Sequence, residues 1–342
     1  MERISLTDAE AASIKSLLSE AARQYASVDE TRFLMDAPVL AHELPRRVRA
    51  FLNHFKQDEP PAGGCVISTG LVNDADLGPT PAHWKSRPAV SPTLKEEILF
   101  VLLNSLLGEP IAWATQQNGY IVHDVLPIKG DEKEQISTGS EQLIWWHNED
   151  AFHPYRGDYV SLMCLRNPDL TPTTLSPVSK ARLTRAELEI LFEPRFVIKP
   201  DESHAEKNGD GQHVRHDEDP HLLSAYEQIR RMHKNPPKLA VLYGDPKCPY
   251  IRIDPFFMEP PTDDQTMSAL NSLVRSMDEA LTEVVLLPGD FLFVDNYRAV
   301  HGRKPFKARY DGTDRWLKRM NVTRDLRKSR DSRESCRSRV IF

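Results

Sequence analysis

The chain of 342 residues changes character near residue 110, and this change restricts the possible folds more than any other feature. Beyond it, short apolar runs alternate with turns, and residues 159–165 form a run long enough for a buried strand. Further on, two apolar runs, 284–287 and 291–294, flank the tight turn Pro288-Gly289-Asp290, which is typical of a strand–turn–strand unit. Several short strands with few helices predict a mainly β fold, a double-sheet jelly roll with flanking helices.

The part before residue 110 carries helical signals instead. Thr7 and Glu10 have the spacing of a capping box, and apolar residues recur after them at helical intervals. A second helix is expected at residues 39–55. A third is expected at residues 94–107, where Thr93 and the glutamate three positions later suggest another capping box.

We expect a single domain with three parts. Residues 1–110 form a helical support, residues 111–320 form the jelly-roll core, and residues 321–342 form a basic tail. The polar stretch at about residues 200–220 has no periodicity and is rich in acidic residues and histidines. A long polar loop inside a compact domain is usually either a functional lid or disordered, and we favour a lid.

Composition excludes several classes of protein. With 40% hydrophobic residues and a net charge of −6, the chain can bury a core and has no overall polyanion-binding character. Its four cysteines form no CxxC pair, which fits free thiols in a reducing cytoplasm rather than a zinc knuckle. We find neither a secretory signal nor a membrane-spanning run. The expected protein is cytoplasmic, without a membrane or nucleic-acid partner, and its oligomeric state stays open.

A metal site is suggested at the end of the strand expected at residues 143–146. His147 and Glu149 are two positions apart, so that on a strand their side chains point to the same face. His301 follows the strand–turn–strand unit and is the third candidate ligand. Two imidazoles and one carboxylate leave open positions on an ion, which suits Fe(II) with a chelating co-substrate. The alternatives are a hydrogen-bonded surface pair and a zinc site that includes His153.

Two arginines follow His301. Arg315 and Arg319 lie 14 and 18 residues beyond it. Guanidinium groups bind carboxylates in a bidentate manner with fixed geometry. A 2-oxoglutarate co-substrate needs such an anchor for its far carboxylate, and an amino-acid substrate needs a second one. The alternative interpretation is a solvated basic strand.

At this point four motifs together resemble a known family. They are HNEDAFHPYRGDY, LRNPD, LPGDFLFVDNYRAVHGR and DRWLKR, which begin at residues 147, 165, 287 and 314. They look like the clavaminate synthase-like branch of Fe(II)/2-oxoglutarate-dependent oxygenases, and within it like the L-arginine β-hydroxylases of peptide-antibiotic biosynthesis. The resemblance covers about residues 111–320. It implies a distorted, cupin-like jelly roll (a double-stranded β-helix) that uses Fe(II), 2-oxoglutarate and O2 to hydroxylate the β-carbon (C3) of L-arginine.

The resemblance also assigns roles to single residues. For the metal and the co-substrate, these are the iron ligands His147, Glu149 and His301, the 2-oxoglutarate anchor Arg315, and Thr174 or its neighbour Thr173. For the substrate, they are Arg319 and Ser137 at the α-carboxylate, Glu149 at the amine, and Gln117 near the polar groups.

The guanidinium end of the substrate is assigned to Asp254. A second acid is expected two residues earlier, where this chain has Arg252. A buried cation needs a paired charge, and that charge could come from the lid, whose candidates are Asp217, Glu218 and Asp219. Otherwise the substrate differs, with lysine, asparagine and cyclic guanidino amino acids such as enduracididine as alternatives.

Two interpretations from other classes remain open. A metal-binding cupin without redox chemistry would need no anchor of the Arg315 type. A nucleic-acid-binding module would use the basic tail at residues 324–330, but this segment lacks interleaved aromatic residues, so we expect a solvated terminus or a cover over the sheet.

Overall fold

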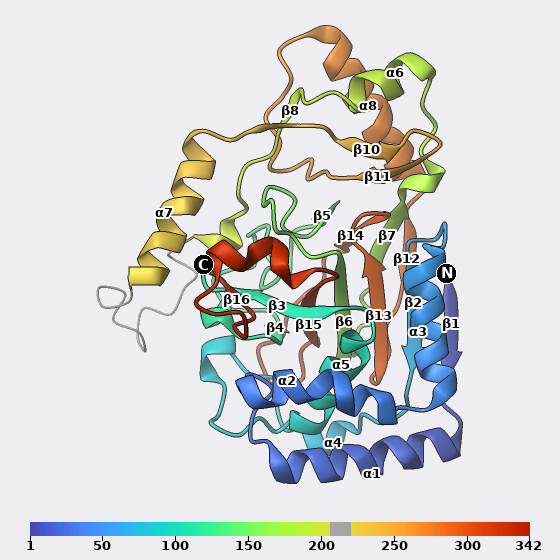
Figure 1. Cartoon of the computed structure of the whole chain (residues 1–342), viewed down its shortest axis with the longest axis vertical. Helices are drawn as coiled ribbons and strands as arrows, with labels where there is room; N and C mark the ends of the chain where they lie inside the picture. Colours follow the sequence, from blue (N-terminus) through green and yellow to red (C-terminus); the bar gives the residue numbers. More distant parts are fainter. Residues whose placement is uncertain (206–219) are drawn as a thin grey trace.

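Two β-sheets form the centre of the molecule (Figure 1). The computed structural model describes residues 1–205 and 220–342, so the predicted lid acids Asp217, Glu218 and Asp219 lie outside the described residues. Within that part, the larger sheet has eight strands in the order β1 (Glu2–Ser5), β2 (Gly64–Ser68), β13 (Asp290–Asp295), β6 (Tyr159–Arg166), β15 (Trp316–Thr323), β3 (Glu109–Trp113) and β16 (Val340–Ile341), with β4 (His123–Val125) also paired to β15. The smaller sheet has the order β12 (Thr282–Val284), β7 (Thr173–Pro177), β14 (Ala299–Arg303) and β5 (Ile144–His147).

The two sheets share one apolar core. Leu162 on β6 and Leu317 on β15 face inward from the larger sheet, while Leu175 on β7 and Val284 on β12 belong to the smaller one, and all are buried in the same cluster. Alternate residues of each strand point to this core, as expected for sheets that pack face to face. The predicted mainly β fold with flanking helices is therefore correct.

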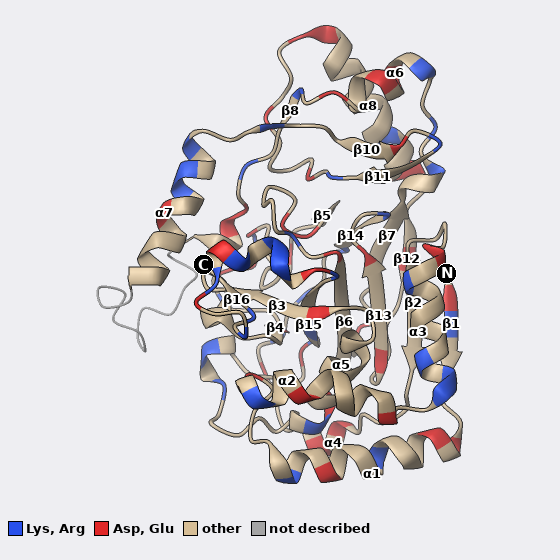
Figure 2. Cartoon of the chain, viewed as in Figure 1, with Lys and Arg blue, Asp and Glu red and all other residues tan. Residues whose placement is uncertain are grey.

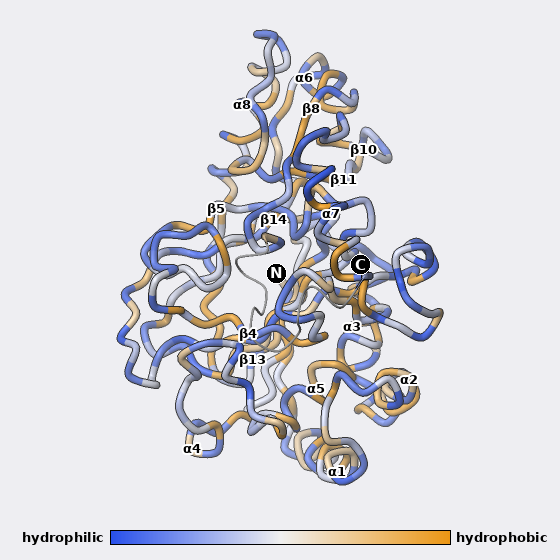
Figure 3. The backbone as a smooth tube through the Cα atoms, turned by 90° about the vertical axis from the view of Figure 1, so that its left-hand side faces the viewer, coloured by the Kyte–Doolittle hydropathy of each residue, from blue (hydrophilic) through white to orange (hydrophobic). Residues whose placement is uncertain are grey.

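Helices cover the outer face of the larger sheet. They are α1 (Asp8–Gln24), α2 (Thr31–Leu40), α3 (Arg46–Asp58) and α5 (Leu94–Ser105), whose buried residues join a cluster with those of β2, β6, β13 and β15. Figure 3 shows apolar and polar residues side by side along α1 and α2, as amphipathic helices require. In Figure 2, acidic and basic residues are interspersed over the same helices.

The capping predictions have mixed outcomes. Thr7 forms the predicted capping box with Glu10 at the start of α1. The box predicted at Thr93 is wrong, because the Thr93 hydroxyl donates to Glu97 Oε1 (2.9 Å) and makes no cap to the helix. The helical stretch predicted near residues 39–55 is helical over most of that range, but it is divided, because α2 ends at Leu40 and α3 begins after Pro45. Because proline lacks an N–H, Pro45 fits at the N-cap of α3, although Pro38 lies within α2.

The predicted division of the chain also needs two corrections. The first 110 residues include two strands of the larger sheet, β1 and β2, besides the helices. The last 22 residues are more than a solvated tail: β15 continues to Thr323, and β16 pairs in parallel with β3. Arg333 is buried and donates to the carbonyls of Leu326 (2.9 Å) and Ser338 (2.7 Å).

The remaining elements lie around the two sheets (Figure 1). They are α4 (Asp74–Leu77), α6 (Arg185–Leu191), α7 (Pro220–Lys234), α8 (Asp264–Glu279), the pair β8 (Phe196–Val197) and β9 (Lys238–Leu239), and the hairpin β10 (Leu242–Asp245) and β11 (Cys248–Ile251). The helices α6 and α8 pack with this hairpin at the top of Figure 1. No helix among the described residues is long and apolar enough to cross a membrane.

A buried lysine ties the helical layer to β15, the strand that carries Arg319 and directly follows Arg315. Lys318 on β15 places its Nζ 2.9 Å from Glu97 Oε1 on α5 and 2.6 Å from Asp124 Oδ1 on β4. Trp316 Nε1 donates to the same aspartate oxygen (2.7 Å). Lys318 and Glu97 are each only 2% exposed, so their charges depend on one another.

We expect Lys318→Met to lower the free energy of unfolding by about 3 kcal/mol or more, because the change removes the buried cation that contacts both carboxylates and leaves Glu97, among the described residues, only the Arg87 cation, at 3.5 Å. The matched control is Lys304→Met, which breaks an exposed ion pair with Glu283 and should cost less than about 1 kcal/mol. Urea denaturation measures both values. Equal losses in the two variants would contradict a structural role for the buried network.

Candidate active site

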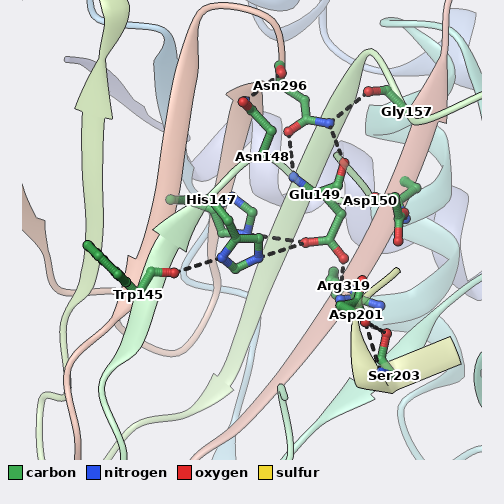
Figure 4. Close-up of polar contacts among 12 residues, drawn as sticks. Trp145, His147, Asn148, Glu149, Asp150, Gly157, Asp201, Ser203, Asn296 and Arg319 are labelled. Atoms are coloured by element: carbon green, nitrogen blue, oxygen red, sulfur yellow. Dashed lines mark hydrogen bonds and ion pairs between the residues drawn. The ribbon is translucent and has the colours of Figure 1, made fainter. Parts of the chain in front are cut away.

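The three predicted metal ligands meet because of how β14 pairs with β5. His301 lies directly opposite His147 in this antiparallel pair, and such residues point to the same face of the sheet. The centroids of the two imidazole rings are 4.8 Å apart. Glu149 lies just past the end of β5, where Asn296 holds the turn by accepting from the Glu149 amide (2.8 Å) (Figure 4).

The three side chains form a donor set that fits a metal ion. Glu149 Oε2 lies 3.7 Å from His147 Nε2 and 3.4 Å from His301 Nε2, and the possible ligand atoms all lie within 4.8 Å of one another. His147 Nδ1 is 2.9 Å from the Trp145 carbonyl, an outer contact that orients metal-binding histidines. His153 does not join this group, because its ring stacks on Trp113 at 4.2 Å. The alternative zinc site therefore lacks His153 as its fourth ligand.

The charges of this group are mutually dependent. Burial alone would raise the pKa of Glu149, but the Arg319 guanidinium and both histidines hold it well below its usual range. Burial would lower the pKa of His147, but the hydrogen bond with Glu149 and the charge of Asp254 raise it to about 9. Glu149 is therefore a permanent carboxylate, the state that a metal ligand needs.

Arg319 joins this centre from β15. Its Nη1 forms an ion pair with Glu149 Oε1, while its Nη2 lies 3.0 Å from His123 Nδ1 and 3.3 Å from Gln116 Oε1. The guanidinium is therefore next to the metal ligand and borders the same cavity. This position suits an anchor for an acidic group bound beside the metal.

Two buried guanidinium groups border the cavity without a carboxylate. Arg315 and Arg303 are 5% and 6% exposed, and within residues 1–205 and 220–342 neither forms an ion pair. Arg303 donates only to the carbonyls of Gly139 and Gln142, and Arg315 Nε lacks a partner among the described atoms. Burial lowers the pKa of Arg315 to about 10 and that of Arg303 to about 9. Uncompensated buried cations are costly, so an anionic ligand is expected here.

The structure distinguishes between the two threonines expected beside the co-substrate. Thr173 on β7 lies opposite Arg303 of β14 and borders the cavity, whereas Thr174 lies opposite Gly302. Because side chains alternate along a strand, Thr174 points away from the cavity.

The residues expected near the substrate's α-carbon need a second correction. Ser137 borders the cavity. Gln117 does not reach the metal centre, because its side chain pairs with the backbone of Asp124, at 2.8 Å to the carbonyl and 2.9 Å from the amide. Its neighbour Gln116 contacts Arg319 instead. Because the two glutamines are adjacent, the sequence alone could not show which of them contacts Arg319.

Two carboxylates also border the cavity. Asp254 follows β11, and its Oδ1 accepts from the amides of Phe256 (3.1 Å) and Phe257 (3.2 Å). Burial raises the pKa of Asp254 to about 6 against the opposing charge of His147. Asp201 borders the same cavity and was not predicted. It lies at the start of the polar stretch at residues 200–220, whereas the predicted acids, Asp217, Glu218 and Asp219, lie at its other end.

Arg252 has a role outside the cavity. Its Nε donates to the Ala151 carbonyl (2.6 Å) and its Nη2 to the Phe152 carbonyl (2.9 Å). These carbonyls lie in the turn that follows Glu149. Arg252 therefore braces the backbone beside the metal ligand, and the strand cannot supply the second acid.

Comparison with known proteins agrees with this geometry. The family model described as "Taurine catabolism dioxygenase TauD, TfdA family" matches residues 189–321. An enduracididine beta-hydroxylase from Streptomyces hygroscopicus is 44% identical over 350 aligned residues, and an L-ornithine/L-arginine 3-hydroxylase from Catenulispora acidiphila is 43% identical over 352, each over the whole of both chains. The chain belongs to the non-haem iron, 2-oxoglutarate-dependent oxygenases.

A solved structure extends this agreement to the fold. The non-heme iron oxygenase OrfP in complex with Fe, succinate and (3S)-hydroxy-L-Arg is 45% identical over the full length of both chains, with a TM-score of 0.94. Another OrfP structure contains Fe and alpha-ketoglutaric acid. The predicted class of enzyme, an iron-dependent oxygenase with 2-oxoglutarate as co-substrate, is thus confirmed, and the alternative of a cupin without redox chemistry is set aside.

We expect His147→Ala to weaken Fe(II) binding by at least roughly 100-fold, because changes even outside the ligand shell cost 10- to 100-fold. Anaerobic calorimetric titration with Fe(II) alone measures the affinity. His42→Ala, which changes an exposed histidine far along the chain, should bind as the parent protein does. An unchanged affinity in His147→Ala would sink the assignment of this ligand.

Proposed function

We propose that this oxygenase hydroxylates free L-arginine at its β-carbon (C3). The observation that carries the proposal is the cavity beside the metal centre, which is lined by the guanidinium groups of Arg303, Arg315 and Arg319 and by the carboxylates of Asp201 and Asp254. An amino acid with a cationic side chain can pair with both groups of residues: its carboxylate with the guanidinium groups and its side chain with the carboxylates. The 43–44% identity to two hydroxylases, one of them named for L-ornithine and L-arginine, supports the same substrate class.

In this proposal the two sheets form a distorted jelly roll that holds Fe(II) between His147, Glu149 and His301. Bound iron would supply the activation of O2 that is coupled to the oxidative decarboxylation of 2-oxoglutarate. The protein's contribution is to place the ligands on one side, so that positions for the co-substrates stay open.

Arg315 binds the far carboxylate of 2-oxoglutarate. It is buried, lacks a carboxylate partner among the described residues and borders the cavity. Thr173 on β7 supplies a hydroxyl, and Arg303, opposite it on β14, adds a second positive charge. A dianionic keto acid would compensate charges that are costly in the free protein.

The α-amino and α-carboxylate groups of the amino acid would bind beside the metal ligand Glu149. Arg319 and Ser137 hold the α-carboxylate, and Glu149 accepts from the α-amine. The ion pair between Arg319 and Glu149 already places these two groups in contact. A zwitterion can bind there with its opposite charges paired to the two side chains.

Asp254 and Asp201 hold the guanidinium. Two carboxylates bordering the same cavity are the arrangement that a planar cation with several donors requires. When both ends of the substrate are held in this way, its β-carbon is presented to the metal. Water is then displaced from around that carbon.

A second candidate substrate is a cyclic guanidino amino acid. The relative that is 44% identical over its whole length is an enduracididine beta-hydroxylase. Such a substrate shares the α-amino acid head and the guanidinium of arginine, so the same two groups of residues would recognise it. Lysine and asparagine lack that planar cation and are weaker candidates.

The direct test is a panel of free amino acids incubated with the enzyme, Fe(II), 2-oxoglutarate and O2. We expect mass spectrometry to detect a product of arginine with one added oxygen, together with succinate, because arginine pairs with both groups of residues. Citrulline serves as the matched neutral analogue and should react poorly. Oxidation of lysine in preference to arginine and enduracididine would overturn the proposal.

The same panel, run on Asp254→Asn and Asp201→Asn, isolates the carboxylates. Asparagine keeps the hydrogen bonds that these side chains accept from the backbone. Each change should lower kcat/KM for arginine by roughly 10- to 100-fold, since a charge-assisted hydrogen bond is lost. The value for citrulline should change little. Equal losses for both amino acids would contradict guanidinium binding at these carboxylates.

For the co-substrate, we expect Arg315→Lys to raise the KM for 2-oxoglutarate by roughly tenfold or more, because lysine cannot bind a carboxylate in a bidentate manner. Succinate formation at varied 2-oxoglutarate measures this value. The control is Arg309→Lys, whose exposed guanidinium pairs with Asp169 on the surface. If both variants keep the parent KM, Arg315 is not the anchor.

A further inference from the structure

A short segment delivers Asp201 to the wall of the active site. The 3-10 helix η5 (Glu202–His204) begins directly after Asp201, whose Oδ1 accepts from the Ser203 amide (2.8 Å). Asp201 and Ser203 both border the cavity (Figure 4). The segment belongs to neither sheet, so other contacts must hold it in place.

One end of the segment is fixed by backbone contacts. The Lys199 amide donates to the Phe257 carbonyl (2.9 Å), and Ile198 forms an isolated bridge with Met258. Phe257 lies close to Asp254 and borders the cavity as well. This end therefore keeps the segment near the other carboxylate that borders the cavity.

The other end is fixed by the side chain of His204. The residue is fully buried; its Nε2 is 3.0 Å from Asp150 Oδ1, and its Nδ1 is 2.7 Å from Thr115 Oγ1. Its ring also meets Phe152 edge to face, with centroids 5.1 Å apart. Both ring nitrogens are thus satisfied by groups of the main body.

The anchor itself is rigid. Asp150 directly follows the metal ligand Glu149, and its Oδ2 accepts from Trp113 Nε1 (2.6 Å) and Asn321 Nδ2 (3.1 Å). Trp113 and Asn321 belong to β3 and β15, adjacent strands of the larger sheet. His204 therefore docks on a carboxylate that is already fixed by the sheet.

Gln116 links this anchor to Arg319. Its Oε1 accepts from Arg319 Nη2 (3.3 Å), and its Nε2 donates to Ser203 Oγ (2.5 Å) and lies 3.1 Å from His204 Nε2. One amide thus touches both the proposed α-carboxylate anchor and η5. Through these contacts Gln116 ties the position of η5 to that of Arg319.

We propose that His204 is a positioning residue for substrate recognition, which docks on Asp150 and thereby holds Asp201 at the place where a guanidinium binds. This inference rests on the proposed function for the identity of the substrate. His204 is separated from the cavity wall by its own segment and acts through Asp201. The alternative is that His204 only packs in the core and has no effect on substrate recognition.

The test compares His204→Phe, which keeps an aromatic ring but loses both hydrogen bonds, with His204→Gln, which can still donate to Asp150. In His204→Phe we expect the KM for arginine to rise by roughly tenfold or more, because Asp201 is no longer fixed. The kcat should fall less, and the preference for arginine over citrulline should shrink. His204→Gln should recover part of that preference.

A double-mutant cycle separates positioning from packing. If His204 acts through Asp201, adding His204→Phe to Asp201→Asn should cause little further loss in kcat/KM for arginine. Fully additive losses would overturn the proposal. His153→Phe is the matched control, since His153 is also buried and packs on Trp113, but no hydrogen bond among the described residues joins it to η5. It should keep the parent preference for arginine.

Hydrogen exchange gives a readout that does not depend on activity. In the parent protein the amides of Ser203, His204 and Ala205 are bonded within the segment. They should exchange faster in His204→Phe but not in His153→Phe, and unchanged exchange would overturn the anchoring. If the parent enzyme does not oxidise any guanidino amino acid, the proposed function fails, while the exchange result still decides whether His204 holds Asp201 in place.

Discussion

The active site depends on the pairing of β14 between β5 and β7. This register puts His301 opposite His147 on one side and Arg303 opposite Thr173 on the other. One short strand therefore brings a metal ligand and a cation of the co-substrate region to the same face. A slip by one residue would turn both away from the cavity. Gly302, between them, permits the close approach of β5, because a Cβ there would lie only 2.5 Å from the Ile144 carbonyl oxygen.

The buried charges are arranged for ligands more than for the free protein. Glu149 is balanced by its histidines and Arg319, but Arg315 and Arg303 lack carboxylate partners among the described residues. Burial also raises the pKa of Asp254 to about 6, a sign that its negative charge is poorly compensated. A keto-acid dianion and a guanidinium would each relieve one of these imbalances. These uncompensated charges cost stability when no ligand is bound, and a ligand of opposite charge relieves that cost. The site therefore selects charged ligands.

Local patterns in the sequence were sufficient for the features that depend on local geometry. The two-residue spacing of His147 and Glu149 and the capping box at Thr7 follow from short-range rules, and the structure brings both together as predicted. The choice between Thr173 and Thr174 depends on strand register, which a single sequence leaves open by one residue. Asp201 was missed because a loop has no periodicity, so the sequence could not indicate which acid of the polar stretch turns inward.

The placement of Arg252 and Asp201 separates metal binding from substrate choice. Arg252 takes the strand position expected for an acid and uses it to brace the carbonyls of Ala151 and Phe152, next to the metal-ligand turn. The second carboxylate comes instead from a segment held mainly by the side chain of His204. A change in that segment can move Asp201 without shifting a strand that carries an iron ligand. Recognition of the far end of the substrate can therefore vary while the chemistry at the metal stays the same.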